Sequence, residues 1–310
     1  MNAVWSFWSK PYRAHYHHAW YSELHHLLAW VLSVQTARQH FEELHLYTDD
    51  AGARLLVDGI GLPFTRISTE LNTLDACDPD WWALGKVQTY RLQTEPFIHL
   101  DADVFLWKPI SEHLANADVF SQSIEPLGPQ FAHYQPEQME KLLAIKPGGW
   151  LPDEWRWFRQ AGVPQHGECC GVLGGNHVDF IRHYADLAFR LVTDPANQFA
   201  WQHLRDKRQH MLSVEQYLLA ACVDYHAMQP GSAYRGVALE RFFVEPGAPY
   251  NSVHQTRVGY THLAGGIKHN ESVARHLADQ VRSDYPQEYK RCSAIAQEST
   301  VLSPSRTMRP

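Results

Sequence analysis

The sequence lacks several features that define large protein classes. Its five cysteines are an odd number, and no two of them form a C-x-x-C pair, so we expect neither a disulfide framework nor a zinc clip. No run of about 18 apolar residues occurs, which excludes a membrane-spanning helix. The first residues lack the basic and apolar segments of a signal peptide. These absences predict reduced thiols and a cytoplasmic protein.

An excess of positive charge is also absent. The formal net charge is -7, so nucleic acid is not an expected partner. The 310 residues are 45% hydrophobic, which is enough for one large α/β domain or two modest ones. Two adjacent histidine pairs, His17-His18 and His25-His26, do not predict a metal cluster, because neighbouring residues on a helix cannot both face one ion.

Strands and helices are predicted to alternate over the first hundred residues. Short β-prone segments occupy residues 3–8, 44–48 and 64–68, and a fourth ends at Asp101. Between them, apolar residues recur at helical spacing. This alternation is typical of a doubly wound, parallel sheet, in which ligands bind beyond the carboxyl ends of the strands.

The second half of the chain has a less regular pattern. Residues 125–167 are rich in proline, glycine and tryptophan, so we expect long loops there, with one helix near residues 139–145 and contacts to an acceptor. Beyond them the pattern predicts strands at residues 171–175 and 258–263, and helices at residues 178–192 and 214–224. The residues after Ser293 show no apolar period, and a disordered tail is predicted.

The strand Phe97–Leu100 leads into Asp101-Ala102-Asp103 and then back to apolar residues. Successive strand residues face opposite ways, so the chain must turn after Asp101 if both carboxylates are to reach one cation. Such a turn would create an oxygen-rich site of the kind that Mg²⁺ or Mn²⁺ prefers. The competing interpretation is a turn whose acids only cap backbone amides.

A second motif strengthens the metal hypothesis. His262-Leu263-Ala264-Gly265-Gly266-Ile267-Lys268 follows the pattern H-x-x-G-x-x-K. The imidazole can complete a metal shell begun by two carboxylates. Glycine lets the backbone approach phosphate oxygens, and lysine neutralises charge on a leaving diphosphate.

With both motifs in view, the chain resembles the GT-A glycosyltransferases of the retaining family 8 type, which includes glycogenin and the lipooligosaccharide galactosyltransferases. Over its whole length it also resembles an uncharacterised bacterial family of GT-A-like proteins. Two positions depart from the family 8 pattern: His269-Asn270 follows the motif lysine, where the family has Pro-Trp, and Cys169-Cys170 stands where it has asparagine before the Gly-Val strand.

The resemblance implies a set of site residues. Asp101, Asp103 and His262 would ligate Mn²⁺ or Mg²⁺. Lys268, with Gly265 in the preceding turn, would contact the donor diphosphate. Further donor contacts are implied for Ala102, Lys86, Tyr47, Thr48 and Asp49, the last three near uracil or ribose. Glu215 and Gln216 resemble the family's Asp-Gln pair beside the reacting sugar.

The resemblance also implies a fold and a function. The fold would be α/β of GT-A type, with a Rossmann-like, mostly parallel mixed sheet flanked by helices. Residues 1–292 would form one domain, with a nucleotide-sugar-binding half (1–124) and an acceptor-side half containing the metal histidine (125–292), followed by a tail (293–310). The implied reaction is metal-dependent sugar transfer from a nucleotide-diphosphate donor, a UDP-sugar, to an acceptor hydroxyl with retention.

Several alternatives stay open at the level of sequence. Lys86 is also consistent with a solvated helix lysine, Tyr47 with a core aromatic, and Glu215 with a residue that stabilises a helix start. A strand followed by Asp-x-Asp also begins the haloacid-dehalogenase phosphatases, in which Asp101 would be the nucleophile and Asp103 the acid/base. A nucleotide-sugar-binding protein without catalysis is the third possibility. The sequence identifies neither the sugar, the acceptor nor the oligomeric state.

Overall fold

A computed structural model describes residues 1–14, 19–128 and 133–302 of the chain. Its strands are β1 (Asn2–Phe7), β2 (Leu44–Thr48), β3 (Arg66–Ser68), β4 (Phe97–Leu100), β5 (Val104–Leu106), β6 (Val119–Pro126), β7 (His166–Glu168), β8 (Val172–Gly175), β9 (Leu239–Phe243) and β10 (Tyr260–His262). The main sheet has the order β3-β2-β1-β4-β8-β6-β7, with β9 paired to β6. Strands β1 to β4 are mutually parallel, β8 and β7 run antiparallel to their neighbours, and β9 is parallel to β6. The predicted mixed, mostly parallel α/β sheet is confirmed.

Helices cover both faces of this sheet. The α-helices are α1 (Ser9–Ala14), α2 (Glu23–Ala37), α3 (Asp50–Ala53), α4 (Leu84–Arg91), α5 (Glu112–Ala115), α6 (Pro136–Leu143), α7 (Asp153–Gln160), α8 (Val178–Thr193), α9 (Gln198–His203), α10 (Lys207–Leu212), α11 (Leu218–Met228), α12 (Ser252–Val258), α13 (Glu271–Asp284) and α14 (Pro286–Leu302). The π-helical segments are η2 (Arg54–Gly59) and η6 (Ser213–Tyr217), and the 3₁₀ segments are η3 (Glu70–Leu74), η5 (Pro195–Asn197), η7 (Ala248–Tyr250) and η8 (Gly265–His269). In the part of the chain that the structure describes, no helix is long and apolar enough to cross a membrane.

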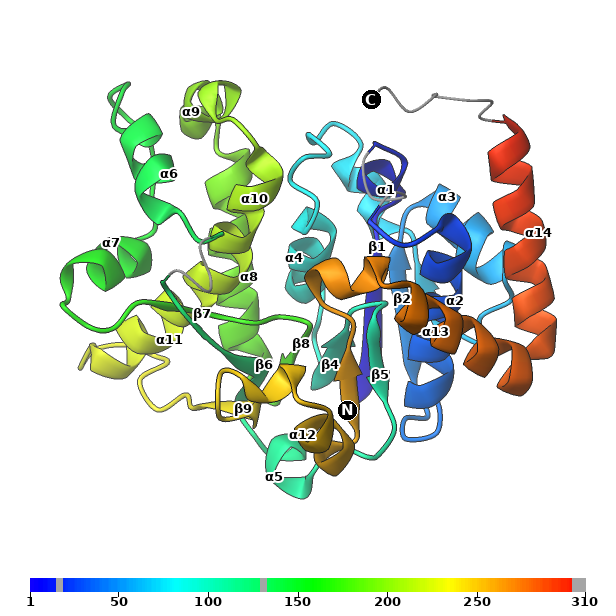
Figure 1. The fold of residues 1–310 in the computed structure, drawn as a ribbon. Helices are drawn as coiled ribbons and strands as arrows, with labels where there is room; N and C mark the ends of the chain where they lie inside the picture. The colour runs from blue at the N-terminus through cyan, green and yellow to red at the C-terminus, as the bar shows by residue number, and fades with distance from the viewer. Residues whose placement is uncertain (15–18, 129–132, 303–310) are drawn as a thin grey trace.

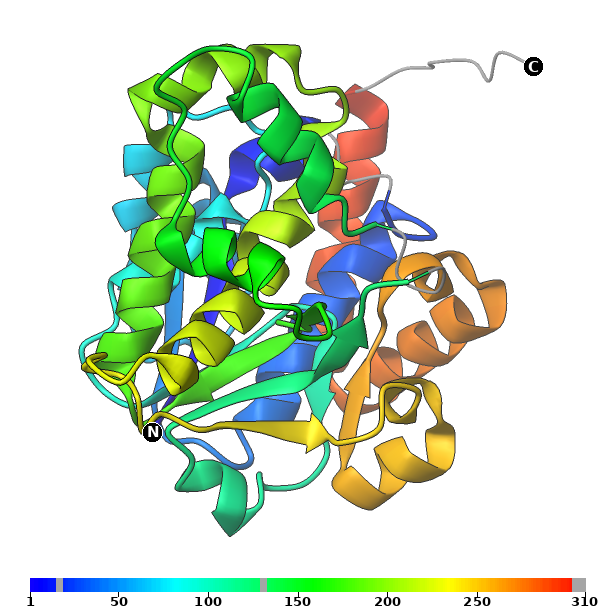
Figure 2. The same cartoon turned by 90° about the vertical axis from the view of Figure 1, so that its left-hand side faces the viewer.

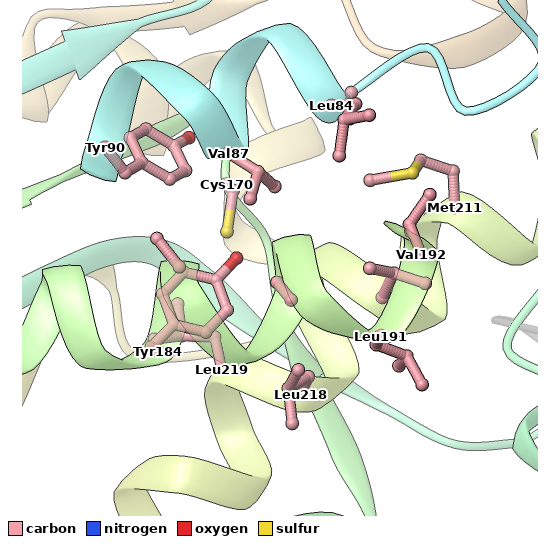
Figure 3. Packing of buried hydrophobic residues seen from close by; sticks show 14 of the residues in the cluster. Leu84, Val87, Tyr90, Cys170, Tyr184, Leu191, Val192, Met211, Leu218 and Leu219 are labelled. Carbon is pink, nitrogen blue, oxygen red and sulfur yellow. The ribbon is translucent and has the colours of Figure 1, made fainter. Parts of the chain in front are cut away.

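Two buried clusters hold the layers together. On one face, α4, α8 and α11 pack through Val87, Tyr184 and Leu219 (Figure 3). On the other face, α2, α13 and α14 pack against the sheet around Leu28 and Val281 (Figure 1). All five cysteines are free thiols, as the absence of C-x-x-C spacing predicted.

The segment rich in proline and glycine contains more regular structure than predicted. Besides α6, the region contains the end of β6, helix α7 and the start of β7, where long loops were predicted. Helix α7 begins right after Pro152 and buries Trp155 and Phe158 at a spacing of three residues. That stripe is short, so its period does not stand out among the surrounding prolines and glycines.

The prediction of a disordered tail is wrong for residues 293–302, because α14 continues through them. Tyr289, Cys292, Ile295 and Ala296 recur at helical spacing and pack on the cluster around α2. The stripe was missed because it alternates with small and polar residues. Residues 303–310 lie outside the described residues, as do His17 and His18.

Candidate metal-binding cleft

The predicted turn after Asp101 is present. Strand β4 ends at Leu100, the Val104 amide donates to the Asp101 carbonyl at 3.0 Å, and β5 then leaves the main sheet. Strand β5 pairs with β10 in a separate antiparallel ribbon, which lies in front of the main sheet in Figure 1. This pairing sets His262 opposite Val104, next to Asp103 in the chain.

The ribbon therefore brings His262 to the two aspartates, which lie about 160 positions earlier in the chain. Ligand atoms of Asp101, Asp103 and His262 all lie within 4.8 Å of one another. Nε2 of His262 is 3.4 Å from Oδ1 of Asp103, and the Leu263 amide donates to the Asp103 carbonyl at 2.9 Å. Two carboxylates and one imidazole this close together form a donor set suited to Mn²⁺ or Mg²⁺.

The orientation of His262 is fixed by a residue that the sequence analysis did not single out. Nδ1 of His262 lies 2.7 Å from Oε1 of Gln122, an atom that also accepts a hydrogen bond from the Tyr260 hydroxyl at 2.6 Å. Since an amide oxygen only accepts, the imidazole proton is on Nδ1, and the lone pair of Nε2 faces Asp103. A metal-ligating histidine is typically held in this way.

Gly171 makes room for this arrangement. Its carbonyl accepts from the Asp101 amide at 3.0 Å. A Cβ at this position would lie 2.6 Å from the His262 ring and 2.7 Å from Oε1 of Gln122. Glycine is therefore required where β8 begins if the imidazole is to stay beside the aspartates.

Two lysines neutralise the paired aspartates. The Lys268 ammonium contacts Oδ2 of Asp103 and lies over the Trp20 ring. Gly265, with φ of +57°, begins the 3₁₀ turn η8 that carries Lys268. Burial by itself would raise the pKa of Asp103, but the Lys268 charge outweighs it and holds that pKa well below its usual range.

Lys86 neutralises Asp101, the other carboxylate of the pair. Its ammonium lies 2.9 Å from Oδ1 of Asp101 and 2.7 Å from Oε1 of Glu215, and it donates to the Cys170 carbonyl at 2.9 Å. The contacts with Asp101 and Cys170 are hydrogen bonds, and the contact with Glu215 is an ion pair. Lys86 is therefore a buried cation at the aspartates, and its predicted contact with a donor stays a prediction.

Glu215 is the second carboxylate in contact with Lys86. Its side chain is fully inaccessible to solvent, and burial raises its pKa to about 7, although the Lys86 charge opposes the shift. Burial likewise raises the pKa of Asp101 against the effect of Lys86. The structure thus links Glu215 to Asp101 through one ammonium group, and any role of Glu215 toward a sugar stays a prediction.

The carboxylates open into a cleft at the carboxyl ends of β1 and β4, which we call the strand-end cleft. Its lining is polar at the base and aromatic along the walls, and comprises Ser6, Phe7, Trp8, Pro11, Tyr12, Trp20, His26, Trp82, Gly85, Lys86, Asp101, Ala102, Asp103 and Lys268. The aromatic walls were not predicted, because they come from three separate segments of the chain. Aromatic faces of this kind stack on nucleobases and sugars.

Other predicted donor contacts have partners within the chain. The Thr48 hydroxyl donates to the Phe7 carbonyl at 2.6 Å. Asp49 accepts from the Ser9 amide at 2.8 Å and caps α3 through the Gly52 amide at 2.7 Å. Neither Thr48 nor Asp49 lines the strand-end cleft, so their contact with a nucleotide stays a prediction.

Tyr47 and Gln216 also lie away from the lining of this cleft. Tyr47 is buried in the core cluster. Gln216 lies in η6, where its side chain contacts the Tyr134 hydroxyl, and that hydroxyl donates to Glu125 at 2.6 Å. The predicted position of Gln216 beside an anomeric carbon is untested.

Comparison with known proteins gives a family. The model of the family of unknown function DUF6734 matches residues 1–295. The chain belongs to this family. No curated protein matches the DUF6734 chain at a significant level.

Among solved structures, the DUF6734 chain is similar to the galactosyltransferase LgtC in complex with donor and acceptor sugar analogs. The match covers 99% of this chain and 98% of that chain, with 12% sequence identity and a TM-score of 0.41. At that similarity the comparison bears on neither substrate nor mechanism.

Proposed function

We propose that the chain is a metal-dependent glycosyltransferase that takes its sugar from a nucleotide diphosphate, a UDP-sugar, and transfers it to an acceptor hydroxyl with retention. The observation that supports this most is the convergence of Asp101, Asp103 and His262 within 4.8 Å at a cleft that Lys268 also lines. A metal ion and an ammonium group would neutralise a diphosphate, and the aromatic walls of the cleft suit the base and the sugar joined to it.

The three converging residues would hold Mn²⁺ or Mg²⁺. When bound, the ion would supply positive charge that stabilises the leaving diphosphate. The chain's own residues fix this arrangement beforehand: Lys86 holds Asp101, and Gln122 holds His262. Because these partners are already hydrogen bonded, little reorganisation is needed for ligand binding.

Lys268 would exchange Asp103 for the donor diphosphate when the metal ion and the donor bind. In the structure its ammonium contacts Asp103, the position that a divalent ion would neutralise. With a cation held by Asp103, the Lys268 ammonium would leave that carboxylate and contact the diphosphate. The turn η8, which begins at the left-handed residue Gly265, carries Lys268 at the edge of the cleft and would allow this short movement.

The remaining predicted residues complete the proposal. Residues 1–124 would bind the nucleotide sugar, with Ala102 lining the cleft and Tyr47, Thr48 and Asp49 near the base or ribose. Residues 125–292 would bind the acceptor, with Glu215 and Gln216 toward the reacting sugar. The cytoplasmic location stays a prediction.

A donor-hydrolysis assay tests the proposal. Purified protein is incubated with a panel of UDP-sugars and Mn²⁺, and UDP release is measured. We expect release that disappears in Asp103→Ala and in His262→Ala, whereas Asp58→Ala and His203→Ala, which replace exposed residues, keep wild-type rates. Activity that survives both cleft substitutions would refute the metal role.

The same protein distinguishes the two alternative functions. Metal-dependent UDP binding without transfer to any acceptor in a broad panel would favour a binding protein. Phosphate release from an aryl phosphate, with a trapped phosphoryl group on Asp101, would favour a phosphatase.

A further inference from the structure

A second group of side chains that could ligate a metal ion lies between α7, α8 and α11. It comprises Glu154, His183 and His226, and ligand atoms of all three lie within 4.8 Å of one another. These helices face the viewer in Figure 2. None of the three residues lines the strand-end cleft, so the group is separate from the site described above.

The distances within this group match a tetrahedral ion. Oε1 of Glu154 lies 3.0 Å from Nε2 of His183 and 3.5 Å from Nε2 of His226, and the two Nε2 atoms are 3.2 Å apart. Ligands about 2.0–2.1 Å from a tetrahedral Zn²⁺ are separated by about 3.3 Å. The three atoms therefore form one face of a tetrahedron of the correct size.

The imidazole of His226 is held with its ligand atom facing the group. Its Nδ1 lies 2.7 Å from the Ser232 hydroxyl, which accepts from the Tyr234 amide at 2.9 Å. A proton on Nδ1 directed to Ser232 would leave the Nε2 lone pair of His226 facing Glu154 and His183. A hydrogen bond on the distal nitrogen is the usual support of a metal-bound histidine.

Aromatic packing fixes both rings. The Tyr234 ring lies 5.1 Å from the His183 ring and 5.2 Å from the His226 ring, centroid to centroid, and Phe180 packs on His226 at 6.0 Å. Glu154 and His226 are buried, with 6% and 8% of their surface exposed. The donors are thus oriented without an ion and do not need to be assembled by one.

A cavity meets the group on its open side. It has a volume of ≈ 560 Å³, and Glu154, His226, Tyr225, Ser232 and Tyr234 contribute to its wall. The cavity gives an ion a route of entry and gives a water molecule room at the fourth coordination position. Three protein ligands with one open position are the usual arrangement of non-structural zinc sites.

We propose that Glu154, His183 and His226 form a binding site for Zn²⁺ that joins α7, α8 and α11. Two imidazoles and one carboxylate make a nitrogen-rich donor set that favours Zn²⁺ and Co²⁺. Asp101, Asp103 and His262 instead offer mainly oxygen, which favours Mg²⁺ and Mn²⁺. The two sites therefore differ in the metal that they select.

Cobalt spectroscopy of the full-length chain tests this site. The Asp103→Ala/His262→Ala protein, in which the first group is disabled, is stripped with a chelator and titrated with Co²⁺. We expect one equivalent to bind with the intense visible bands of tetrahedral Co²⁺ and to be displaced by Zn²⁺. Adding His183→Ala should abolish these bands, whereas adding His203→Ala should leave them unchanged. Bands that persist in the His183→Ala protein, or no tetrahedral bands in its parent, would overturn the proposal.

Two further measurements do not depend on how well an alanine variant folds. Glu154→Gln keeps the side-chain shape and should weaken Zn²⁺ binding by about 10- to 100-fold in equilibrium dialysis. Crystals of the wild-type chain soaked in Zn²⁺ should show an anomalous peak between Glu154, His183 and His226. Unchanged affinity in the Glu154→Gln protein, or no peak at this position in the soaked crystals, would contradict the site.

Discussion

At the scale of single residues, Gly171 is the position where the smallest change should have the clearest effect. In the Gly171→Ala protein the new methyl group would meet the His262 ring at 2.6 Å, so the imidazole must move away from the aspartates. We expect Mn²⁺ affinity to fall by about 10- to 100-fold, measured by isothermal titration calorimetry.

Gly231→Ala is the matched control, because a Cβ at Gly231 meets nothing within 4 Å. Its Mn²⁺ affinity should equal that of the wild type. A Gly171→Ala protein that binds Mn²⁺ normally would show that His262 is not a ligand.

Replacing Lys268 should change the affinity for the metal and the affinity for the nucleotide in different ways. Lys268→Met removes the ammonium that contacts Asp103, so Mn²⁺ without nucleotide should bind at least as tightly as it does to the wild type. The affinity for UDP in the presence of Mn²⁺ should fall by about 10- to 100-fold, since a charged hydrogen bond is lost. Calorimetric titrations with each ligand measure both effects.

Lys290→Met replaces an exposed lysine of α14 and should change neither affinity. If the Lys268→Met protein loses Mn²⁺ binding but keeps its UDP affinity, the proposed exchange of partners is wrong.

At the scale of elements, the strands and helices were predicted where a local pattern is strong. The sheet strands β1 to β4 and the turn after Asp101 follow from alternation, apolar runs and the need to aim two carboxylates together. The pairing of β5 with β10 could not be derived, because it joins segments about 160 positions apart. The motif H-x-x-G-x-x-K suggested a contact between them but gave no geometry.

The supporting residues were harder to find for the same reason. Gln122, in β6, and the aromatic walls of the cleft carry no local motif, and only the fold brings them to the site. Lys86 was predicted as a donor contact, and the structure adds contacts with Asp101, Glu215 and the Cys170 carbonyl. A sequence gives the type of charge at a position, but its partners depend on tertiary packing.

Helix α14 supplies a test at this scale. Cys292 is fully buried against the α2 layer, whereas the neighbouring Ala294 is exposed. Cys292→Asp should lower the free energy of unfolding by about 2–4 kcal/mol, because it buries an unpaired charge. Urea denaturation measures the change. Ala294→Asp should cost less than about 0.5 kcal/mol, and equal effects of the two substitutions would contradict a packed helix.

At the scale of the whole molecule, one buried carboxylate joins three strands at the far edge of the sheet. Glu168 of β7 accepts from Ser121 of β6 at 2.7 Å and from Arg241 of β9 at 3.0 Å, and lies 3.3 Å from His166. Burial alone would raise the pKa of Glu168, but hydrogen bonds from His166 and Arg241 outweigh it and lower that pKa.

This network makes stability depend on pH. A carboxyl whose pKa is lower in the folded state stabilises the protein above its unfolded pKa of about 4.3 and stops doing so as the pH falls through the folded value. Glu168→Gln should therefore lower the free energy of unfolding by about 3 kcal/mol at pH 7. This difference from the wild type should shrink below about pH 4. Denaturation curves across this range measure it, and a constant difference would contradict the assignment.

The proposed function depends on Asp101, Asp103 and His262 holding one divalent cation beside a nucleotide diphosphate. The most direct measurement is anomalous diffraction from crystals of the chain soaked in Mn²⁺ and UDP. We expect a manganese peak within coordination distance of all three side chains, with the diphosphate on the ion and on Lys268. Manganese bound elsewhere, or UDP in the cleft with no ion between these residues, would contradict it.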